Sequence, residues 1–411
     1  MKDISYFRYS WRFDDRKQFL ELPFPMSEYE RRVSNVKARM AESKLDALMI
    51  LGDVRERGNI RYLTNFYAQL GHSAVILPLD GDPILATSAA AHGEPLHSFV
   101  YETWVRDIRG ALYRAFPPNP PTVLQRVKEI LDETKLRRAR IGIVGWQLLG
   151  YDFFVNLKQA FPEVEWVEWL RPYELLKAVK SPLEVRVFEH AGAALDTAFA
   201  AALAVAKPGA TELEVAGALE HEMRRGGVET VSYLFDTRVC SGPRAALKNG
   251  NPTARKLQRG DLLFIDISAT YHGYALDCAT STVVDAEPTQ EQLALLEPAA
   301  QMTEALVAAS REGTPACELV EVARAVATKN GQGKNFIEFL VGHGLGCSQV
   351  EAPHCHLNSD DVLASGMIYA VEPMIVDPVL GTGTVERICC CGKDGGRLLT
   401  RLPLRVWDVR W

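Results

Sequence analysis

The sequence predicts an α+β protein of two domains, and three observations support this. The chain has 411 residues, a length that is ordinary for two domains. Its first part alternates strand-like apolar runs with helical segments, which is typical of a mixed α/β domain. Its second part opens with two long helical segments and continues with strand-like runs in pairs, which indicates an α+β domain. Hydrophobic residues make up 47% of the chain, enough to fill both cores.

The first domain is expected over residues 26–170, after an N-terminal arm of residues 1–25 that is rich in aromatic and charged side chains. An amphipathic helix is predicted over residues 28–43, with Ser27 as its N-cap. The remaining elements follow the alternation of apolar runs and turn residues. They are strands at 47–51, 74–78, 84–87 and 140–144 and helices at 122–134 and 151–161.

The second domain is expected over residues 171–411, joined to the first by a linker helix at 169–179. Ser181 and Pro182 predict the start of a long helix that runs to about residue 206, where Pro208 and Gly209 break the pattern. Thr211 then begins a second helix through residue 225.

Two acidic residues occupy a predicted hairpin in the second domain. The apolar run 262–268 contains Asp266, the turn signal His272-Gly273 follows, and the next run contains Asp277. Eleven residues across a tight turn can bring both side chains onto one face of the hairpin. An isolated aspartate at a strand end usually caps a turn. An acid inside an apolar strand is different, because burying an unpaired carboxylate is costly.

Three further candidates lie closer to the C-terminus. His343 stands among three glycines, where the backbone can approach an ion closely, although an isolated Gly-His-Gly is more often a simple loop. Glu372 ends a predicted strand at 367–374 in a Glu-Pro pair, and Glu386 lies in the next predicted strand, 384–388.

Together, these five residues are a plausible ligand set for two metal ions. Asp266, Asp277, His343, Glu372 and Glu386 follow one another at separations of 11, 66, 29 and 14 residues. Four carboxylates and one imidazole suit Mn, Co, Zn or Fe and can bridge two divalent ions. Two such ions can share a hydroxide, which is a strong nucleophile at neutral pH.

These residues sit in motifs that resemble the pita-bread metallohydrolase superfamily, which includes creatinase, prolidase, aminopeptidase P and methionine aminopeptidase. The short step from Glu372 to Glu386 is most similar to the prolidase branch. Segment 59–66 resembles creatinase-type N-terminal domains, and segment 180–184 resembles the start of the catalytic domain; the likeness spans roughly residues 28–405. The motifs are Phe264-Ile265-Asp266, Gly273-Tyr274-Ala275-Leu276-Asp277, Gly342-His343-Gly344-Leu345-Gly346, Val371-Glu372-Pro373 and Val385-Glu386.

The resemblance implies a pita-bread catalytic domain with a smaller creatinase-type N-terminal domain. It implies two divalent ions held by the five residues, with Asp277 and Glu386 bridging. Glu372 and His343 are the implied catalytic residues: the hydroxide shared by the ions attacks, and Glu372 carries the proton. The resemblance also implies a homodimer in which the N-terminal domain shapes the mouth of the partner's active site.

The sequence departs from the peptidases of this superfamily where they hold the substrate. The histidine seven residues after the metal-binding histidine is Val350 here, and Asn249 or Gly250 replaces the one near the Asn-Pro element. Phe339 and Thr384 replace a further histidine and an arginine of aminopeptidase P. These donors are typically worth factors of about 10² to 10⁴ in rate. His354, His356, His272 and Arg387 are the candidates to replace these donors, and His354, His356 and Arg387 are predicted to contact substrate. Arg55, in the loop before segment 59–66, is a further candidate contact for an anionic group of the substrate.

Three functional interpretations remain open. The leading one is a metal-dependent hydrolase that cleaves an amide or other C–N bond in a small, non-standard substrate. The second is a prolidase-like Xaa-Pro dipeptidase or aminopeptidase with relocated histidines. The third is a non-catalytic pita-bread binding protein, against which an intact ligand set argues.

Composition narrows the range of partners. The net charge of −6 argues against nucleic acid as a partner. No apolar stretch is long enough to span a membrane, and the first residues have no signal-peptide core, so a cytoplasmic location is expected. All eight cysteines follow residue 239 and are expected to be reduced thiols.

Overall fold

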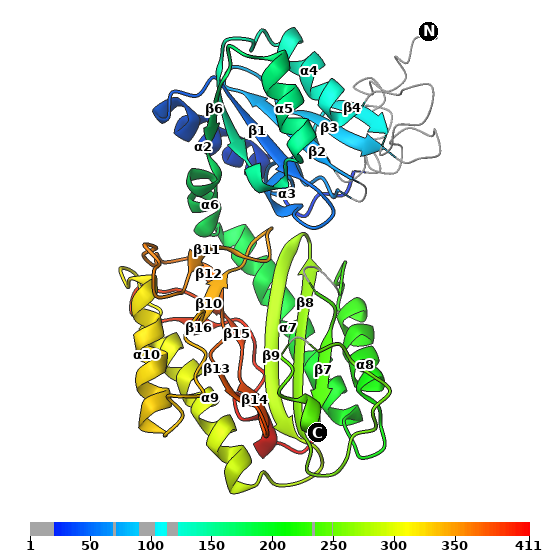
Figure 1. The fold of residues 1–411 in the computed structure, drawn as a ribbon, viewed down its shortest axis with the longest axis vertical. Helices are drawn as coiled ribbons and strands as arrows, with labels where there is room; N and C mark the ends of the chain where they lie inside the picture. The colour runs from blue at the N-terminus through cyan, green and yellow to red at the C-terminus, as the bar shows by residue number, and fades with distance from the viewer. Residues whose placement is uncertain (1–19, 69–70, 90–102, 113–121, 232–234, 249) are drawn as a thin grey trace. The chain divides into compact units, whose positions relative to one another are not determined.

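The protein is described here from a computed structural model, which covers residues 20–68, 71–89, 103–112, 122–231, 235–248 and 250–411. It divides into two compact units, Met1–Lys177 and Ala178–Trp411, and each is described by itself (Figure 1). The aromatic residues predicted to form an interface arm lie at positions 6–19, outside the described residues.

The N-terminal unit is built on one mixed sheet of six strands in the order β4-β3-β2-β1-β5-β6. The strands β1 and β2 are antiparallel, as are β2 and β3, whereas β3–β4, β1–β5 and β5–β6 are parallel. In chain order the elements are α2 (Met26–Glu42), β1 (Ala47–Gly52), α3 (Gly58–Thr64), β2 (Ser73–Pro78), β3 (Ile84–Ala89), β4 (Asp107–Leu112), α4 (Val123–Glu133), β5 (Arg140–Val144), η4 (Trp146–Leu148), α5 (Tyr151–Ala160), β6 (Glu165–Glu168) and α6 (Leu170–Ala178).

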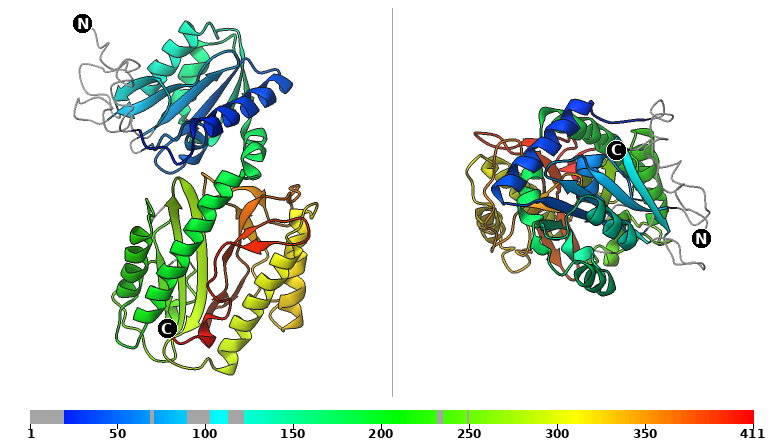
Figure 2. Two further views of the ribbon diagram at one scale, coloured as in Figure 1. Left: turned by 180° about the vertical axis from the view of Figure 1, so that it is seen from behind. Right: turned by 90° about the horizontal axis from the view of Figure 1, so that it is seen from above.

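Helices cover both faces of this sheet. Ala47, Met49 and Leu51 of β1 belong to the core that lies under α4 and α5. Successive strand residues point to opposite faces, so the equally buried Leu48 and Ile50 face the side that α2 and α3 cover (Figures 1 and 2). A strand buried on both faces has no polar alternation, which is why these runs are continuously apolar.

The predicted elements of this unit are confirmed, with one error at a helix start. The first helix begins at Met26 after Pro25, which makes no side-chain cap, so the prediction of Ser27 as N-cap was wrong. Pro25 fits that position because its fixed φ favours the turn into a helix. Thr122 begins α4 as its N-cap and forms a capping box with Gln125, in which each side chain accepts a hydrogen bond from the other residue's backbone N–H.

The second unit carries helices in two pairs and strands in three sheets. The sheets are β7-β8-β9, β11-β10-β12-β15-β16 and β13-β14. Its elements are α7 (Pro182–Val205), α8 (Glu212–Arg225), β7 (Arg238–Ser241), η5 (Gly242–Arg244), β8 (Leu262–Tyr271), β9 (Tyr274–Val283), α9 (Gln290–Ala309), α10 (Ala316–Lys329), β10 (Gly342–Gly344), β11 (Glu351–His354), β12 (Ile368–Val371), β13 (Met374–Asp377), β14 (Gly381–Thr384), β15 (Arg387–Cys390), β16 (Arg397–Leu398) and η6 (Val406–Asp408).

The two helix pairs flank the strands. Helices α7 and α8 pack against each other and against β7, β8 and β9, while α9 and α10 pack together on the side of β13 and β14 (Figure 1). Capping boxes begin both helices of the first pair, through Ser181 with Glu184 in α7 and Thr211 with Glu214 in α8. The strands between the pairs are covered from both sides, so β9 is buried along its whole length. The predicted opening pair of helices and the paired strands are confirmed, whereas the second helix pair, α9 and α10, was not predicted.

The predicted strand 384–388 does not exist as one element. β14 ends at Thr384 and β15 begins at Arg387, so Val385 and Glu386 lie between two strands of different sheets. The chain switches sheets there because the Glu386 backbone N–H donates to the carbonyl of Ala279 on β9. That bond fixes Glu386 beside the β8–β9 hairpin.

Candidate metal centre

The hairpin β8–β9 brings Asp266 and Asp277 onto one face. Asp266 pairs with Ala279 across the hairpin, and Asp277 pairs with Ser268. Paired residues share a face, and so do residues two apart on a strand, so the two aspartates are diagonal neighbours. Both side chains are buried.

His343 sits at the centre of the three-residue strand β10, and each neighbouring glycine is required by its surroundings. A Cβ at Gly342 would lie 2.3 Å from the carbonyl oxygen of Ala370, and one at Gly344 would lie 2.1 Å from that of Ala352. The strands β11 and β12, which pair with β10, therefore approach it closely only because these positions lack side chains. This packing holds the buried His343 imidazole with its Nε2 atom 3.4 Å from Asp277 Oδ2.

The two glutamates complete the cluster from the ends of strands. Glu372 follows β12, and its Oε1 lies 3.6 Å from His343 Nε2. Glu386 is buried where the chain passes from β14 to β15. Asp277, His343 and Glu386 offer ligand atoms that all lie within 4.8 Å of one another. Asp266 and Glu372 adjoin this group, so the five predicted residues come together from four separate stretches of chain.

The cluster contains acceptors that nothing in the described part of the chain satisfies. Asp266 Oδ1, Asp277 Oδ1 and Glu386 Oε1 are buried without a hydrogen-bond partner. Buried carboxylate oxygens without donors are costly and are normally paired or bound to a cation. Their presence in one place indicates a site built for positive charge.

The electrostatics agree with this interpretation. Burial and the charge of Asp277 raise the pKa of Asp266 well above its usual value, although Arg238 acts to lower it. Burial and the charges of Asp277, Glu372 and Asp266 likewise raise the pKa of Glu386. Burial lowers the pKa of His343, but the hydrogen bond to Asp277 and the charge of Glu372 outweigh it and raise that pKa to about 9. The carboxylates repel one another, and divalent cations would relieve that repulsion.

Two polar neighbours of the aspartates were missed by the sequence reasoning. Gln349 Nε2 donates to Asp277 Oδ2 at 2.6 Å, and Arg238 Nη1 donates to Asp266 Oδ2 at 3.0 Å. The guanidinium of Arg238 lies over the ring of Phe235, 3.4 Å from its centroid. Arg238 stands directly opposite Asp266 in the pairing of β7 with β8. That register is set by tertiary packing, so the sequence offered a signal only for Gln349, a polar residue three positions after the glycine-rich motif 342–346.

Several positions differ from the histidines and arginine expected in peptidases of this superfamily. The residues found there offer few hydrogen-bond donors to the carboxylate cluster. Val350 is 42% exposed and Phe339 is 82% exposed. Thr384 is buried, and its hydroxyl donates to the carbonyl of Pro373. A Cβ at Gly250 would lie 2.6 Å from Cys240 Sγ, so no side chain fits there without rearrangement. Asn249 lies outside the described residues.

The four proposed substrate contacts have different surroundings. His354 on β11 and His356 just after it are half-buried, with ring centroids 6.4 Å apart. Arg387 is fully buried, and its guanidinium donates to backbone carbonyls. The prediction that it contacts substrate was therefore wrong, and its role is in core packing. The carbonyls belong to Ala279, Glu386, Leu402 and Pro403. Arg55 is exposed in the N-terminal unit, and its backbone N–H donates to Asp53 Oδ1.

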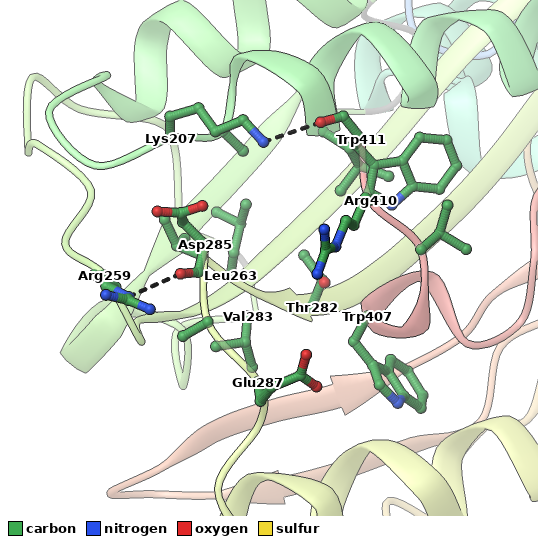
Figure 3. Close-up of a pocket in the computed structure, with 15 residues that line it drawn as sticks. Lys207, Arg259, Leu263, Thr282, Val283, Asp285, Glu287, Trp407, Arg410 and Trp411 are labelled. Carbon is green, nitrogen blue, oxygen red and sulfur yellow. Dashed lines mark hydrogen bonds between the residues drawn. The ribbon is translucent and has the colours of Figure 1, made fainter.

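A pocket of about 450 Å³ lies elsewhere in the second unit (Figure 3). It is lined by the end of α7, the ends of β8 and β9 and the C-terminal segment, including Lys207, Arg259 and Trp407. Lys207 Nζ donates to the carbonyl of Trp411 across it. None of the five predicted ligands lines this pocket, so it is separate from the carboxylate cluster.

Comparison with known proteins identifies the family. The model of metallopeptidase family M24 matches residues 186–392, which contain the whole cluster, and the creatinase/prolidase N-terminal domain model matches residues 32–176. The chain belongs to metallopeptidase family M24. It is therefore a metal-dependent, peptidase-like hydrolase, and the predicted pita-bread fold with a creatinase-type N-terminal domain is confirmed.

Individual members of family M24 are similar over most of their length. The Xaa-Pro dipeptidase of Pyrococcus furiosus is 32% identical over 67% of this chain and 76% of its own. The crystal structure of the prolidase from Pyrococcus furiosus is 27% identical, has a TM-score of 0.72 and covers 89% of this chain and 99% of that one. The X-Pro aminopeptidase from Thermotoga maritima shares the fold, with a TM-score of 0.79 at 23% identity over 90% of this chain and 98% of that one.

Two further sequence-based expectations concern the cysteines and membrane-spanning helices. All eight cysteines are free, as expected for reduced thiols. Among the described residues, no helix is both long and apolar enough to cross a membrane.

Proposed function

We propose that this chain is a metal-dependent hydrolase that cleaves an amide or other C–N bond in a small molecule other than a standard Xaa-Pro peptide. One contrast carries the proposal. The carboxylate cluster is complete and has buried oxygens without partners, while Val350, Thr384 and Gly250 offer no imidazole or guanidinium beside it. The metal-binding residues are retained, and the residues that would hold a peptide are not.

Asp266, Asp277, His343, Glu372 and Glu386 would hold two divalent ions, with Asp277 and Glu386 placed to bridge. Their donor atoms are carboxylate oxygens and one imidazole nitrogen, which suit manganese, cobalt, zinc or iron. When bound, the ions would polarise the scissile carbonyl and supply a nucleophile from water at neutral pH.

Glu372 is the residue we assign to proton transfer. Its side chain is 12% exposed, more than those of Asp266, Asp277 and His343, so it lies on the open side of the cluster. Burial and the charge of Asp277 raise the pKa of its carboxyl, although the charge of His343 acts to lower it. A carboxyl with a raised pKa takes up and releases a proton more readily near neutral pH.

The substrate of the proposed reaction is not held by imidazoles at the usual positions. His354 and His356 are the nearest remaining imidazoles in sequence to the His343 motif, and both are half-buried. We retain them as proposed substrate contacts and keep Arg55 as a prediction for the N-terminal unit. Arg387 is not retained, because its donors are taken by backbone carbonyls.

Hydrolysis of Xaa-Pro dipeptides is the second candidate. A specific observation favours it: the relative from Pyrococcus furiosus, named Xaa-Pro dipeptidase, is 32% identical to this chain. In that case His354 or His356 would have to supply the proton-transfer and carbonyl contacts that Val350 lacks.

A substrate screen separates the two candidates. The full chain, loaded with Mn²⁺ or Co²⁺, is assayed against small amides, amidines and cyclic C–N compounds and against Ala-Pro and Met-Pro. We expect turnover of a non-peptide substrate and poor hydrolysis of both dipeptides. Efficient dipeptide cleavage, with kcat/KM at or above about 10⁴ M⁻¹s⁻¹, would favour the second candidate.

The metal content is a separate prediction. Elemental analysis after purification with Mn²⁺ or Co²⁺ should give close to two ions per chain, because the five ligands and the unsatisfied oxygens suit a bridged pair. The variant Asp277→Asn removes a bridging charge and should lower the content. Less than half an equivalent under saturating metal, with the fold intact, would contradict the proposed site.

A further inference from the structure

Gln349 is a buried polar residue at the cluster that is not among the five ligands. It is 2% exposed, whereas the next residue, Val350, is 42% exposed. The Gln349 side chain therefore points inward from a segment whose neighbouring side chain points to solvent. Its Nε2 atom donates to Asp277 Oδ2 at 2.6 Å.

The partner of Gln349 fixes which way its amide faces. The donor end of the amide, Nε2, is the end that meets the Asp277 carboxyl, at 2.6 Å from Oδ2. The other end, Gln349 Oε1, is buried and has no hydrogen-bond partner among the described residues. Gln349 thus uses its donor on the aspartate while its acceptor is left without a donor from the protein, which indicates that the contact with Asp277 decides its placement.

The segment that carries Gln349 is anchored to its surroundings on both sides. The Ala275 N–H on β9 donates to the carbonyl of Gly346 at 2.7 Å, two residues before Asp277. At the other end, Glu351 accepts from Lys180 Nζ at 2.9 Å in a fully buried ion pair. A Cβ at Gly346 would lie 2.0 Å from Glu351 Oε1, so the segment is also packed tightly on itself. These contacts hold Gln349 at a fixed position relative to β9.

Gln349 is therefore the donor that holds one oxygen of Asp277. Its Nε2 atom lies 2.6 Å from Oδ2, while Oδ1 has no partner among the described residues. His343 Nε2, 3.4 Å from Oδ2, is the nitrogen that would bind an ion. Restraining one oxygen of a carboxylate fixes the direction of the other, and hydrogen bonds to ligating carboxylates are a recurrent means of tuning metal sites.

We propose that Gln349 is a positioning residue for the metal centre, which orients the Asp277 carboxylate and leaves Oδ1 available to an ion. This rests on the proposed metal site but is independent of the substrate. It predicts that removing the amide donor impairs ion binding itself, before any step of catalysis.

The test uses Co²⁺ as the probe, because it reports both affinity and ligand geometry. Metal-free full-length protein is titrated with Co²⁺ by calorimetry, and the visible absorption spectrum is recorded at saturation. Gln349→Met keeps the approximate volume without a donor, and Gln349→Glu keeps the shape but replaces the donor with an acceptor. Val350→Ala, the outward-facing neighbour, is the matched control.

We expect Gln349→Met to weaken Co²⁺ binding by about 10- to 100-fold, and both Gln349 variants to change the spectrum at saturation. Val350→Ala should change neither. A purely structural role would lower thermal stability without altering the saturated spectrum, so that result would overturn the proposal. Wild-type affinity and spectrum in whichever Gln349 variants fold would overturn it as well. Failure of wild-type protein to bind Co²⁺ would reject the metal centre itself, whereas failure of the substrate screen alone would leave this inference standing.

Discussion

Glu372 offers the sharpest test of a single side chain. If it carries the proton, Glu372→Gln should lower turnover of whichever substrate is found by a factor of about 10² to 10⁴, because the amide cannot take up a proton. The amide oxygen can still act as a weak ligand, so part of the metal should remain bound. Steady-state kinetics with metal analysis of the same preparation measure both effects.

The control for that prediction is Glu318→Gln, which changes an exposed glutamate in the first turn of α10 and should leave the rate unchanged. A wild-type rate in Glu372→Gln with metal bound would exclude proton transfer and leave Glu372 as a ligand alone.

The substitution Val350→His tests whether the missing imidazole limits peptide hydrolysis, because this is the position where we expect peptidases of the superfamily to have a histidine. Because this side chain is 42% exposed, a histidine fits there with a change in stability of no more than about 0.5 kcal/mol. Positioned proton transfer supplies about 10² to 10⁴ in rate, so even an imperfectly placed imidazole should raise Ala-Pro hydrolysis by about tenfold. The control is Val379→His, which also introduces a histidine at an exposed valine. The same assay on this variant measures any nonspecific effect of an added imidazole. Unchanged Ala-Pro hydrolysis in a folded Val350→His protein would show that the missing imidazole is not what limits dipeptide cleavage.

At the residue scale, the sequence pointed to the five residues that the fold brings together, but not to their neighbours. Asp266 and Asp277 stand out because acids are rare in apolar strands, and His343 because glycines surround it. Arg238 could not be recognised, since its place opposite Asp266 depends on the register of β7 against β8. Arg387 was misassigned because a charged residue beside a ligand suggests a contact with substrate, whereas here it binds backbone carbonyls in the core.

Helix α2 contains a charge cluster that makes stability depend on pH. Glu28 accepts from Arg31 and from Arg32, and Arg32 is buried between aromatic rings. Burial acts to raise the pKa of Glu28, but the hydrogen bonds and charges of the two arginines outweigh it and lower that pKa. A carboxyl with a lowered folded-state pKa stabilises the protein above its unfolded pKa of about 4.3, and this stabilisation is lost as the pH falls through the folded value.

Glu28→Gln should therefore destabilise the N-terminal unit at pH 7 by about 1–3 kcal/mol, since Arg32 is left without its carboxylate. The difference from wild type should shrink below about pH 4. Thermal unfolding from pH 7 downward measures it. Glu42→Gln, in an exposed pair of the same helix with Arg39, should have little effect at any pH. A difference that stays constant with pH would mean that packing, not the charge of Glu28, is responsible.

Whole elements were predicted well where a local signal marks them. The capping boxes of α7 and α8 and the turn of the β8–β9 hairpin are encoded in a few adjacent residues, and each was predicted within one or two positions. The passage from β14 to β15 was missed, because no glycine or proline interrupts residues 384–388 to mark a break between two strands. Between the two strands Val385 and Glu386 pair with the backbone of β9, a long-range contact that the local sequence does not reveal.

For the whole molecule, the prediction is a homodimer in which residues 1–25 contribute to the interface. Tyr6, Phe7, Tyr9, Trp11 and Phe13 give this segment an aromatic content that is typical of interfaces. Light scattering at micromolar concentration should report about twice the chain mass, and removal of residues 1–25 should weaken the dimer. A clean monomer near 45.6 kDa would refute the dimer, and an unchanged dimer after truncation would assign those aromatic residues to packing within one chain.

The fold class can be predicted from the sequence. Strands alternate with helices in the first half, and helices and strands come in pairs in the second half, and both patterns are visible without tertiary information. The cluster is not visible in the same way. The β8–β9 hairpin, which a local turn signal marks, brings Asp266 and Asp277 together. The other three residues reach them only through long-range pairing, such as that of β10 with β12, which no short segment specifies.

The ligands are spread from Asp266 to Glu386, and this spacing has a consequence for folding. Only Asp266 and Asp277 are brought together locally, by the β8–β9 hairpin, and the other three proposed ligands join them through long-range contacts. An ion would meet the full set only after those longer loops have closed, at an entropic cost. Until then the carboxylates only repel one another. An ion should therefore slow unfolding of the second unit far more than it speeds folding, and metal supply in the cell would govern how long the folded protein lasts rather than how fast it forms.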